Sequence, residues 1–198
     1  MTAGHFGLAT GIKKWAPRLP LWALLLSTYL LDVIFLILFA LGIETFAPAN
    51  PANGSSYGGM IIHAYYTHSL VGALLISGAA GWMASKFWGR RSGWVITAVA
   101  FSHWLLDLIV HRPDLPILPG NVGNLPLLGF GLWRFSAISA ALELALVLGG
   151  SYLYFRSARQ LPVPPDGDSS RQRRRVIEAS GVTAVLLILL LATDVLGL

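Results

Sequence analysis

Three side chains that could bind a metal ion lie four residues apart in one apolar stretch, 101-FSHWLLDLIVHRPDL-115. They are His103, Asp107 and His111, which a helix would place on one face. A His–x3–Asp pair on one helix can supply two ligands to a single ion, as the two histidines of H-E-x-x-H do. The spacing predicts a functional role for His103 and Asp107. His111, beside Arg112, could guide a substrate at the mouth of the site or simply end the helix.

Further polar side chains interrupt other apolar stretches. Asp32 and Glu143 each lie near the middle of one. An ionised group at the centre of a membrane span costs about 2.5–3.5 kcal/mol, so each carboxylate must face protein and be paired, protonated or bound to a cation. His63 and His68 differ by five residues, about 140° on a helix. They would converge only if a helix bends or begins between them, with Thr67 as its cap.

The overall composition is that of a membrane protein. Of 198 residues, 55% are hydrophobic and 12% are charged, with a mean hydropathy of +0.66. Soluble domains carry about 25% charged residues. The chain has no cysteine, which excludes disulfides and thiolate metal ligands.

Five stretches are long and apolar enough to cross a bilayer, which takes about 20 residues. We therefore predict an all-α, integral membrane helical bundle of about five transmembrane helices, organised as a single domain over residues 1–198. The predicted spans are 20–43, 67–87, 93–111, 130–155 and 176–197.

Basic residues gather in alternate loops, at 1–19, 86–92 and 156–175. The positive-inside rule then predicts a multi-pass protein of the inner (plasma) membrane with a cytoplasmic N-terminal region and an external C-terminus. Segment 156–175 has the Pro, Gly and Ser content of a flexible cytoplasmic linker. Its 171-RQRRR-175 run directly precedes an apolar span, which favours a cytoplasmic anchor over nucleic-acid binding.

The first 14 residues, MTAGHFGLATGIKK, are too short to span a bilayer. They could form a short re-entrant or interfacial helix ending at Lys13 and Lys14. Such a helix would carry His5 into the bundle, because irregular backbone is tolerated where protein buries it. A frayed terminus is the alternative.

The run 63-HAYYTHSL-70 resembles the first motif of the YdjM-like family, described as LexA-regulated, membrane-bound, metal-dependent hydrolases. The family pattern continues with S-H-x3-D on a later helix, an acidic residue in the first apolar span and a histidine near the N-terminus. The matching residues here are Ser102, His103, Asp107, Asp32 and His5.

The chain departs from that pattern at two positions. Ala64 stands where the family usually has arginine, and Leu31 replaces the proline of a P-D-x-D motif of which only Asp32 remains. The phrases HRPDLP at 111–116 and GLW at 131–133 look like a small subfamily whose members are described as membrane proteins or permeases.

The resemblance implies a membrane-embedded, metal-dependent hydrolase with a divalent metal. The expected primary ligands are His63, His68, His103 and Asp107. Asp32 and His5 would complete the site or serve a second ion. A ligand set of histidines and carboxylates suits zinc, with manganese or iron as alternatives.

The remaining polar residues have expected roles around that centre. Asp32 or Glu143 could act as general base. Arg112 or Arg134, together with His111, could bind an anionic group of the substrate such as phosphate. A site near the outer leaflet would suit a membrane lipid or a lipid-linked phosphoester.

Two other classes of function are open on the sequence. Intramembrane Asp, Glu and His also build the cation sites and proton relays of transporters and ion-conducting proteins. A non-catalytic subunit of a membrane complex, or a homo-oligomer, would use the same residues to bind partner helices.

Overall fold

The structure is a computed structural model that describes residues 1–48, 59–159 and 169–196. The described residues form seven α-helices and two short strands, which confirms the predicted all-α bundle. The helices are α1 (Thr2–Ile12), α2 (Leu21–Thr28), α3 (Leu30–Ala40), α4 (Leu70–Trp88), α5 (Arg90–Val110), α6 (Ser136–Arg159) and α7 (Ser169–Leu196).

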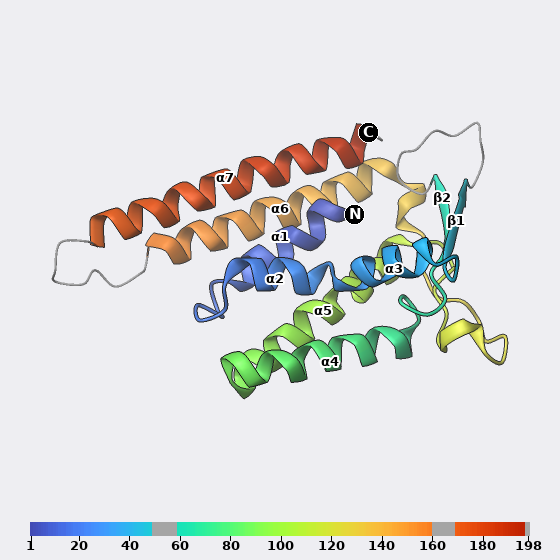
Figure 1. Cartoon of the computed structure of the whole chain (residues 1–198). Helices are drawn as coiled ribbons and strands as arrows, with labels where there is room; N and C mark the ends of the chain where they lie inside the picture. The colour runs from blue at the N-terminus through green and yellow to red at the C-terminus, as the bar shows by residue number, and fades with distance from the viewer. Residues whose placement is uncertain (49–58, 160–168, 197–198) are drawn as a thin grey trace.

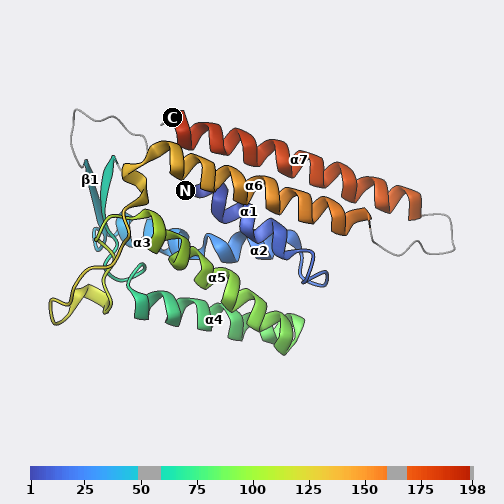
Figure 2. The same cartoon turned by 180° about the vertical axis from the view of Figure 1, so that it is seen from behind.

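The helices lie side by side in a flattened bundle. Helices α6 and α7 form one side, α4 and α5 the other, and α1, α2 and α3 lie between them (Figures 1 and 2). Helices α1, α4 and α6 all end at one end of the bundle, so Lys13, Lys86 and Arg156 gather there. The strands and segment 111–135 lie at the opposite end. The two ends therefore differ in charge, as the sequence pattern indicates.

Four of the helices, α4 to α7, are each long and apolar enough to cross a membrane. Helices α2 and α3 pass the same test only together, as a pair bent by 53°, so the described residues hold four such helices, or five if this pair is counted as one span. The predicted continuous helix over 20–43 is therefore wrong. The break falls at Tyr29, whose φ and ψ of −103° and 8° leave the helical range. At this break, the buried carbonyl of Thr28 accepts a hydrogen bond from the His103 side chain.

Helix α1 packs inside the bundle against α6 and α7 and is not a frayed terminus. Glycines let it approach α6 closely. A Cβ on Gly7 would lie 2.7 Å from the carbonyl oxygen of Leu146, and one on Gly11 would lie 3.1 Å from the Cα of Gly150. This is the small-residue packing that membrane helices use in place of hydrophobic burial. It carries His5, on the same helix, into the centre of the bundle.

A small antiparallel sheet forms where the sequence suggested only a loop. Strand β1 (Thr45–Pro48) pairs with β2 (Met60–His63), with Thr45 opposite His63. Helix α4 starts after both His63 and His68, and its cap is Ser69, which accepts from the amide of Gly72, rather than Thr67.

Segment 111–135 covers the same end of the bundle and satisfies backbone groups that the helix ends leave open. The carbonyls of Pro116 and Ile117 accept from the first amides of α4, and the amide of Gly131 donates to the carbonyl of His111. The predicted linker 156–175 is shorter than expected, because α6 continues to Arg159 and α7 starts at Ser169. Its middle, 160–168, lies outside the described residues.

Candidate metal centre

Four ligand atoms converge where α3, the turn before α4, and α5 meet. Nε2 of His68 lies 3.3 Å from Nε2 of His103, 3.3 Å from Oδ1 of Asp32 and 3.5 Å from Oδ2 of Asp107. Nε2 of His103 lies 3.5 Å from Oδ1 of Asp32 and 3.0 Å from Oδ2 of Asp107. Ligands of a tetrahedral ion with bonds of 2.0–2.1 Å lie about 3.3–3.4 Å apart. The two imidazole nitrogens therefore have the spacing of ligands of one ion, and a carboxylate oxygen of Asp32 and one of Asp107 each lie at ligand distance from both.

The second nitrogen of His103 determines what its Nε2 can do. Nδ1 lies 2.7 Å from the carbonyl oxygen of Thr28. A carbonyl can only accept, so Nδ1 carries the proton and donates it. In the neutral imidazole, Nε2 is then a bare acceptor that faces His68 and the two carboxylates.

His68 is held in the same way by a chain of two hydrogen bonds. Oγ1 of Thr67 donates to Oε2 of Glu44 at 2.8 Å and therefore accepts from Nδ1 of His68 at 2.9 Å. The Nε2 of His68 is left as an acceptor too. Indole Nε1 of Trp104 donates to the carbonyl of His68 at 2.8 Å, which fixes the backbone of the turn. Metal-binding histidines are usually oriented by such a bond from the second ring nitrogen.

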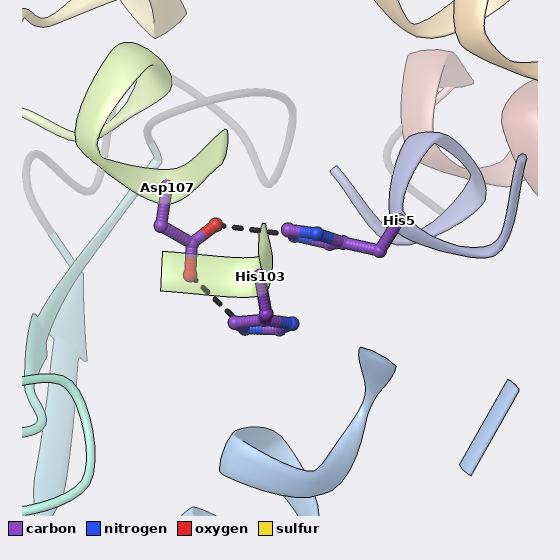
Figure 3. Close-up of side chains that lie close together, drawn as sticks. All are labelled: His5, His103 and Asp107. Atoms are coloured by element: carbon purple, nitrogen blue, oxygen red, sulfur yellow. Dashed lines mark hydrogen bonds and ion pairs between the residues drawn. The ribbon is translucent and has the colours of Figure 1, made fainter. Parts of the chain in front are cut away.

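The carboxylate of Asp107 lies between two imidazoles, and Figure 3 shows one oxygen facing each. Oδ1 is 3.2 Å from Nε2 of His5, and Oδ2 is 3.0 Å from Nε2 of His103. The His5 and His103 rings stack with their centroids 4.0 Å apart. Helix α1 therefore brings His5 to the centre, within a group of potential ligand atoms that includes His103 and Asp107.

The centre is closed on most sides and open at Asp32. The side chains of His68, His103 and Asp107 are 5%, 1% and 6% exposed, whereas that of Asp32 is 28% exposed. Asp32, close to the break between α2 and α3, is therefore the ligand candidate with the most contact with its surroundings. The structure thus places Asp32 among the ligand atoms rather than at a distance suited to a separate general base.

Glu143, the other residue expected to act as a base, lies elsewhere. Its Oε1 accepts from the amide of Gly4 at 3.0 Å, and its side chain is fully buried on α6. Asp194 of α7 accepts from the amide of Ala3 at 3.3 Å. The two carboxylates satisfy amides in the first turn of α1, where helix ends bind anions. The expectation that Glu143 reaches the reaction centre is therefore corrected.

His63 is not brought to the four atoms. It is the last residue of β2, where pairing with Thr45 fixes its backbone, and its Nδ1 lies 3.3 Å from the hydroxyl of Tyr65. Among the described residues, neither of the two groups that could hold a metal includes His63. The prediction that His63 and His68 share an ion is not supported by this geometry.

His111 is buried rather than at an exposed mouth. Its Nδ1 lies 3.0 Å from Oδ1 of Asp114, and its Nε2 lies 4.0 Å from Oδ1 of Asp107. Arg112 follows in the turn after α5 and is half-buried. Arg134 donates to the carbonyls of Gly131 and Phe130, which ties it to its own turn. The distances therefore associate His111 with the centre, while Arg134 serves its loop.

Glu44 is a residue of the site that sequence reasoning missed. It is 1% exposed, and its Oε1 accepts from the amides of Tyr66 and Thr67 while its Oε2 holds the Thr67 hydroxyl. The only signal in the sequence is that Glu44 is the single charged residue of segment 44–66. Thr28 carries no signal at all, because it contributes through its backbone carbonyl.

Comparison of the chain with protein-family models, curated proteins and solved structures found no match. By its fold and its site, the chain is a multi-pass helical membrane protein with a largely buried cluster of histidines and aspartates.

Proposed function

We propose that this chain is a membrane-embedded, metal-dependent hydrolase whose centre is formed by Asp32, His68, His103 and Asp107. One observation carries the proposal. The Nε2 atoms of His68 and His103 lie 3.3 Å apart, and an oxygen of Asp32 and one of Asp107 each lie 3.0–3.5 Å from both, while the Nδ1 protons of both histidines are already donated elsewhere. With both imidazoles neutral, such an arrangement is repulsive unless a cation lies between the atoms, and a bound metal ion supplies that charge.

The donor set supports a divalent metal, with zinc preferred and manganese or iron as alternatives. Neutral imidazole and carboxylate suit these ions, and thiolate ligands are excluded because the chain has no cysteine. A bound zinc ion would lower the pKa of water to about 7 and so provide hydroxide at neutral pH. In this proposal, the buried side chains of His68, His103 and Asp107 hold the ion away from bulk water, and the more exposed Asp32 marks the side from which a substrate enters.

An apolar groove beside the centre favours a lipid substrate. The groove, of about 440 Å³, lies between the α2–α3 break and α7, and its lining includes Phe6, Tyr29 and Leu187. The Tyr29 ring also lies edge-on to the ring of His103, with centroids 6.3 Å apart. Tyr29 lies at the break, three residues before Asp32, so it connects the groove to the centre. A hydrocarbon chain in the groove would therefore place a polar ester group next to Asp32.

The orientation follows from the charge of the bundle ends. The end with Lys13, Lys86 and Arg156 would face the cytoplasm of a cell with a single or inner plasma membrane. The sheet and segment 111–135 would then be external, with the metal centre nearer the outer leaflet. The YdjM-like motif resemblance agrees with this class of protein and supports the same proposal.

The test is hydrolysis of two chromogenic phosphodiesters, methyl and dodecyl p-nitrophenyl phosphate, by the detergent-purified chain. We expect zinc-dependent release of p-nitrophenol, faster for the dodecyl ester, abolished by a chelator and restored by zinc. His103→Ala should be inactive, whereas His63→Ala should retain activity. Equal activity of wild type and His103→Ala would refute the hydrolase at this centre, as would zinc flux into proteoliposomes without any hydrolysis.

A further inference from the structure

A second apolar groove, of about 460 Å³, lies between the α2–α3 pair and α4, and its lining shares only Leu26 with the groove beside the metal centre. Small or buried side chains line its depth: Ala23 of α2 and Ala84 of α4 are each 5% exposed, and Ile96 of α5 is 4% exposed. Large side chains form its rims, where Leu26 and Phe87 are 50% and 77% exposed. The groove is therefore a concave apolar surface that opens outward from the bundle.

The groove has the length and lining that suit an acyl chain. Along α4 it extends from Ile76 to Trp88, twelve residues or about 18 Å, and the hydrocarbon core of one leaflet is about 15 Å deep. The hydroxyl of Ser27 in the lining donates to the carbonyl of Leu24 and so is already satisfied. The groove thus offers a continuous apolar path about as long as one leaflet is deep.

One end of the groove lies at the basic end of the bundle, where α1, α4 and α6 finish. There the rings of Trp22 and Trp88 meet edge-on, with centroids 5.8 Å apart, as is typical of tryptophans at a membrane interface. Just beyond them in the chain lie three exposed arginines, Arg18, Arg90 and Arg91. Among the described residues, none of the three pairs with a carboxylate. Exposed cations at the end of a membrane groove attract an anionic headgroup.

This charge favours a lipid over a second copy of the chain as the occupant. Two copies related by a rotation axis along the membrane normal would keep their basic ends at the same level. The arginines at the end of the groove would then approach those of the partner, and like charges brought together oppose association. An anionic phospholipid neutralises the same charges.

We propose that the groove between α2–α3 and α4 binds an anionic phospholipid from the leaflet at the basic end. Its acyl chain lies along the groove, and its phosphate lies among Arg18, Arg90 and Arg91. Helices α2 and α4 both pack on α5, so the chain fills space between them that the protein leaves open. The lipid thereby supports the broken span that carries Asp32. The inference does not depend on the proposed function, because no metal ligand lines this groove.

The test measures which lipid stays on the protein. The full chain is reconstituted into vesicles of equal parts phosphatidylcholine and phosphatidylglycerol, extracted in a mild detergent and analysed by native mass spectrometry. We expect bound phosphatidylglycerol to exceed bound phosphatidylcholine by at least about fivefold, the gain for one basic side chain near an anionic headgroup.

Two variants separate the groove from the charges. Ala80→Phe should fill the groove and remove the bound lipid, because Ala80 lines it. Leu75→Phe is the matched control, since Leu75 is on the same helix, is 66% exposed and does not line the groove. The combined change Arg18→Gln, Arg90→Gln and Arg91→Gln should keep a lipid but abolish the preference for phosphatidylglycerol. Circular dichroism establishes that each variant is folded, and if Ala80→Phe is not, the arginine variant decides.

Three results would overturn the inference. The first is equal binding of both lipids by the wild type, and the second is a preference for phosphatidylglycerol that survives the arginine changes or a folded Ala80→Phe. The third is a disulfide-linked dimer of Ala80→Cys in the vesicles, because the chain has no other cysteine and such a bond would place a second copy in the groove.

Discussion

Two regions of this bundle hold carboxylates within apolar helices, and they differ in what the carboxylates face. Asp107 and Asp32 face the Nε2 atoms of His68 and His103, whose Nδ1 protons are donated elsewhere. Glu143 and Asp194 face the amides of Gly4 and Ala3, which are donors. The first region therefore has the groups of the proposed metal centre, whereas the carboxylates of the second are satisfied by backbone amides.

The comparison shows that burial of a charged group in a span is not enough to identify a reaction centre. From the sequence, Glu143 and Asp107 look alike, since both interrupt an apolar helix. The partner atoms decide between a site that binds a ligand and a site that anchors a helix. The anchoring region still serves function, because it holds the helix that carries His5.

The largest effect should come from exchanging the matched carboxylates for their amides. Asp107→Asn should lose stoichiometric zinc, because an amide is a far weaker ligand than a carboxylate for this metal. Zinc analysis of the purified variant checks this. Zinc retained at the wild-type level in Asp107→Asn would remove the distinction between the two regions.

The support of His68 offers a smaller but more specific effect. Glu44→Gln keeps the side chain's shape but removes the charge that orients Thr67 and His68. We expect zinc affinity to fall by about 10–100-fold, as for other residues that orient metal ligands. Competition with a fluorescent zinc chelator measures it. An unchanged affinity would show that the chain Glu44–Thr67–His68 does not contribute to metal binding.

The contact between α1 and α6 can be broken without touching either set of carboxylates. Gly7→Ala places a Cβ about 2.7 Å from the Leu146 carbonyl oxygen, and such overpacking typically costs about 1–3 kcal/mol. Gly149→Ala is the matched control, since a Cβ there meets nothing within 4 Å. The stability of the two variants is compared by unfolding each in increasing concentrations of a denaturing detergent. Equal stability of both variants would contradict the close packing of α1.

The smallest effect is expected at Glu143, which holds the first turn of α1 through the Gly4 amide. Glu143→Gln retains an oxygen that can accept from Gly4, so only the charge–dipole part of the contact, about 0.3–1 kcal/mol, is lost. The variant should bind zinc as the wild type does and unfold at slightly lower denaturant. Loss of the metal in Glu143→Gln would instead make Glu143 part of the metal centre.

The sequence was sufficient for the spans but not for the break in the first one. Apolar length defines a membrane helix, which is why α4 to α7 lie close to the predicted ranges. Between Pro20 and Gly42 the chain contains no proline or glycine, so nothing local predicts a break at Tyr29. The break depends on tertiary contacts, among them the bond from His103 to the Thr28 carbonyl.

Part of the site could be predicted from the sequence, because spacing along one helix relates the residues on it. His103 and Asp107 share a helix, so their spacing alone placed them together. His63 was misassigned because its position depends on strand pairing with Thr45, which no helical spacing reveals. The neighbours Glu44 and Asp114 act through side chains that are close only after the loops fold over the end of the bundle.

X-ray absorption at the zinc edge of the zinc-loaded, detergent-purified chain tests the metal centre most directly. The account predicts nitrogen and oxygen ligands at about 2.0–2.1 Å with the scattering of about two imidazoles per zinc, and fewer imidazoles in His103→Ala. A spectrum of zinc coordinated by water alone, identical in wild type and His103→Ala, would contradict it.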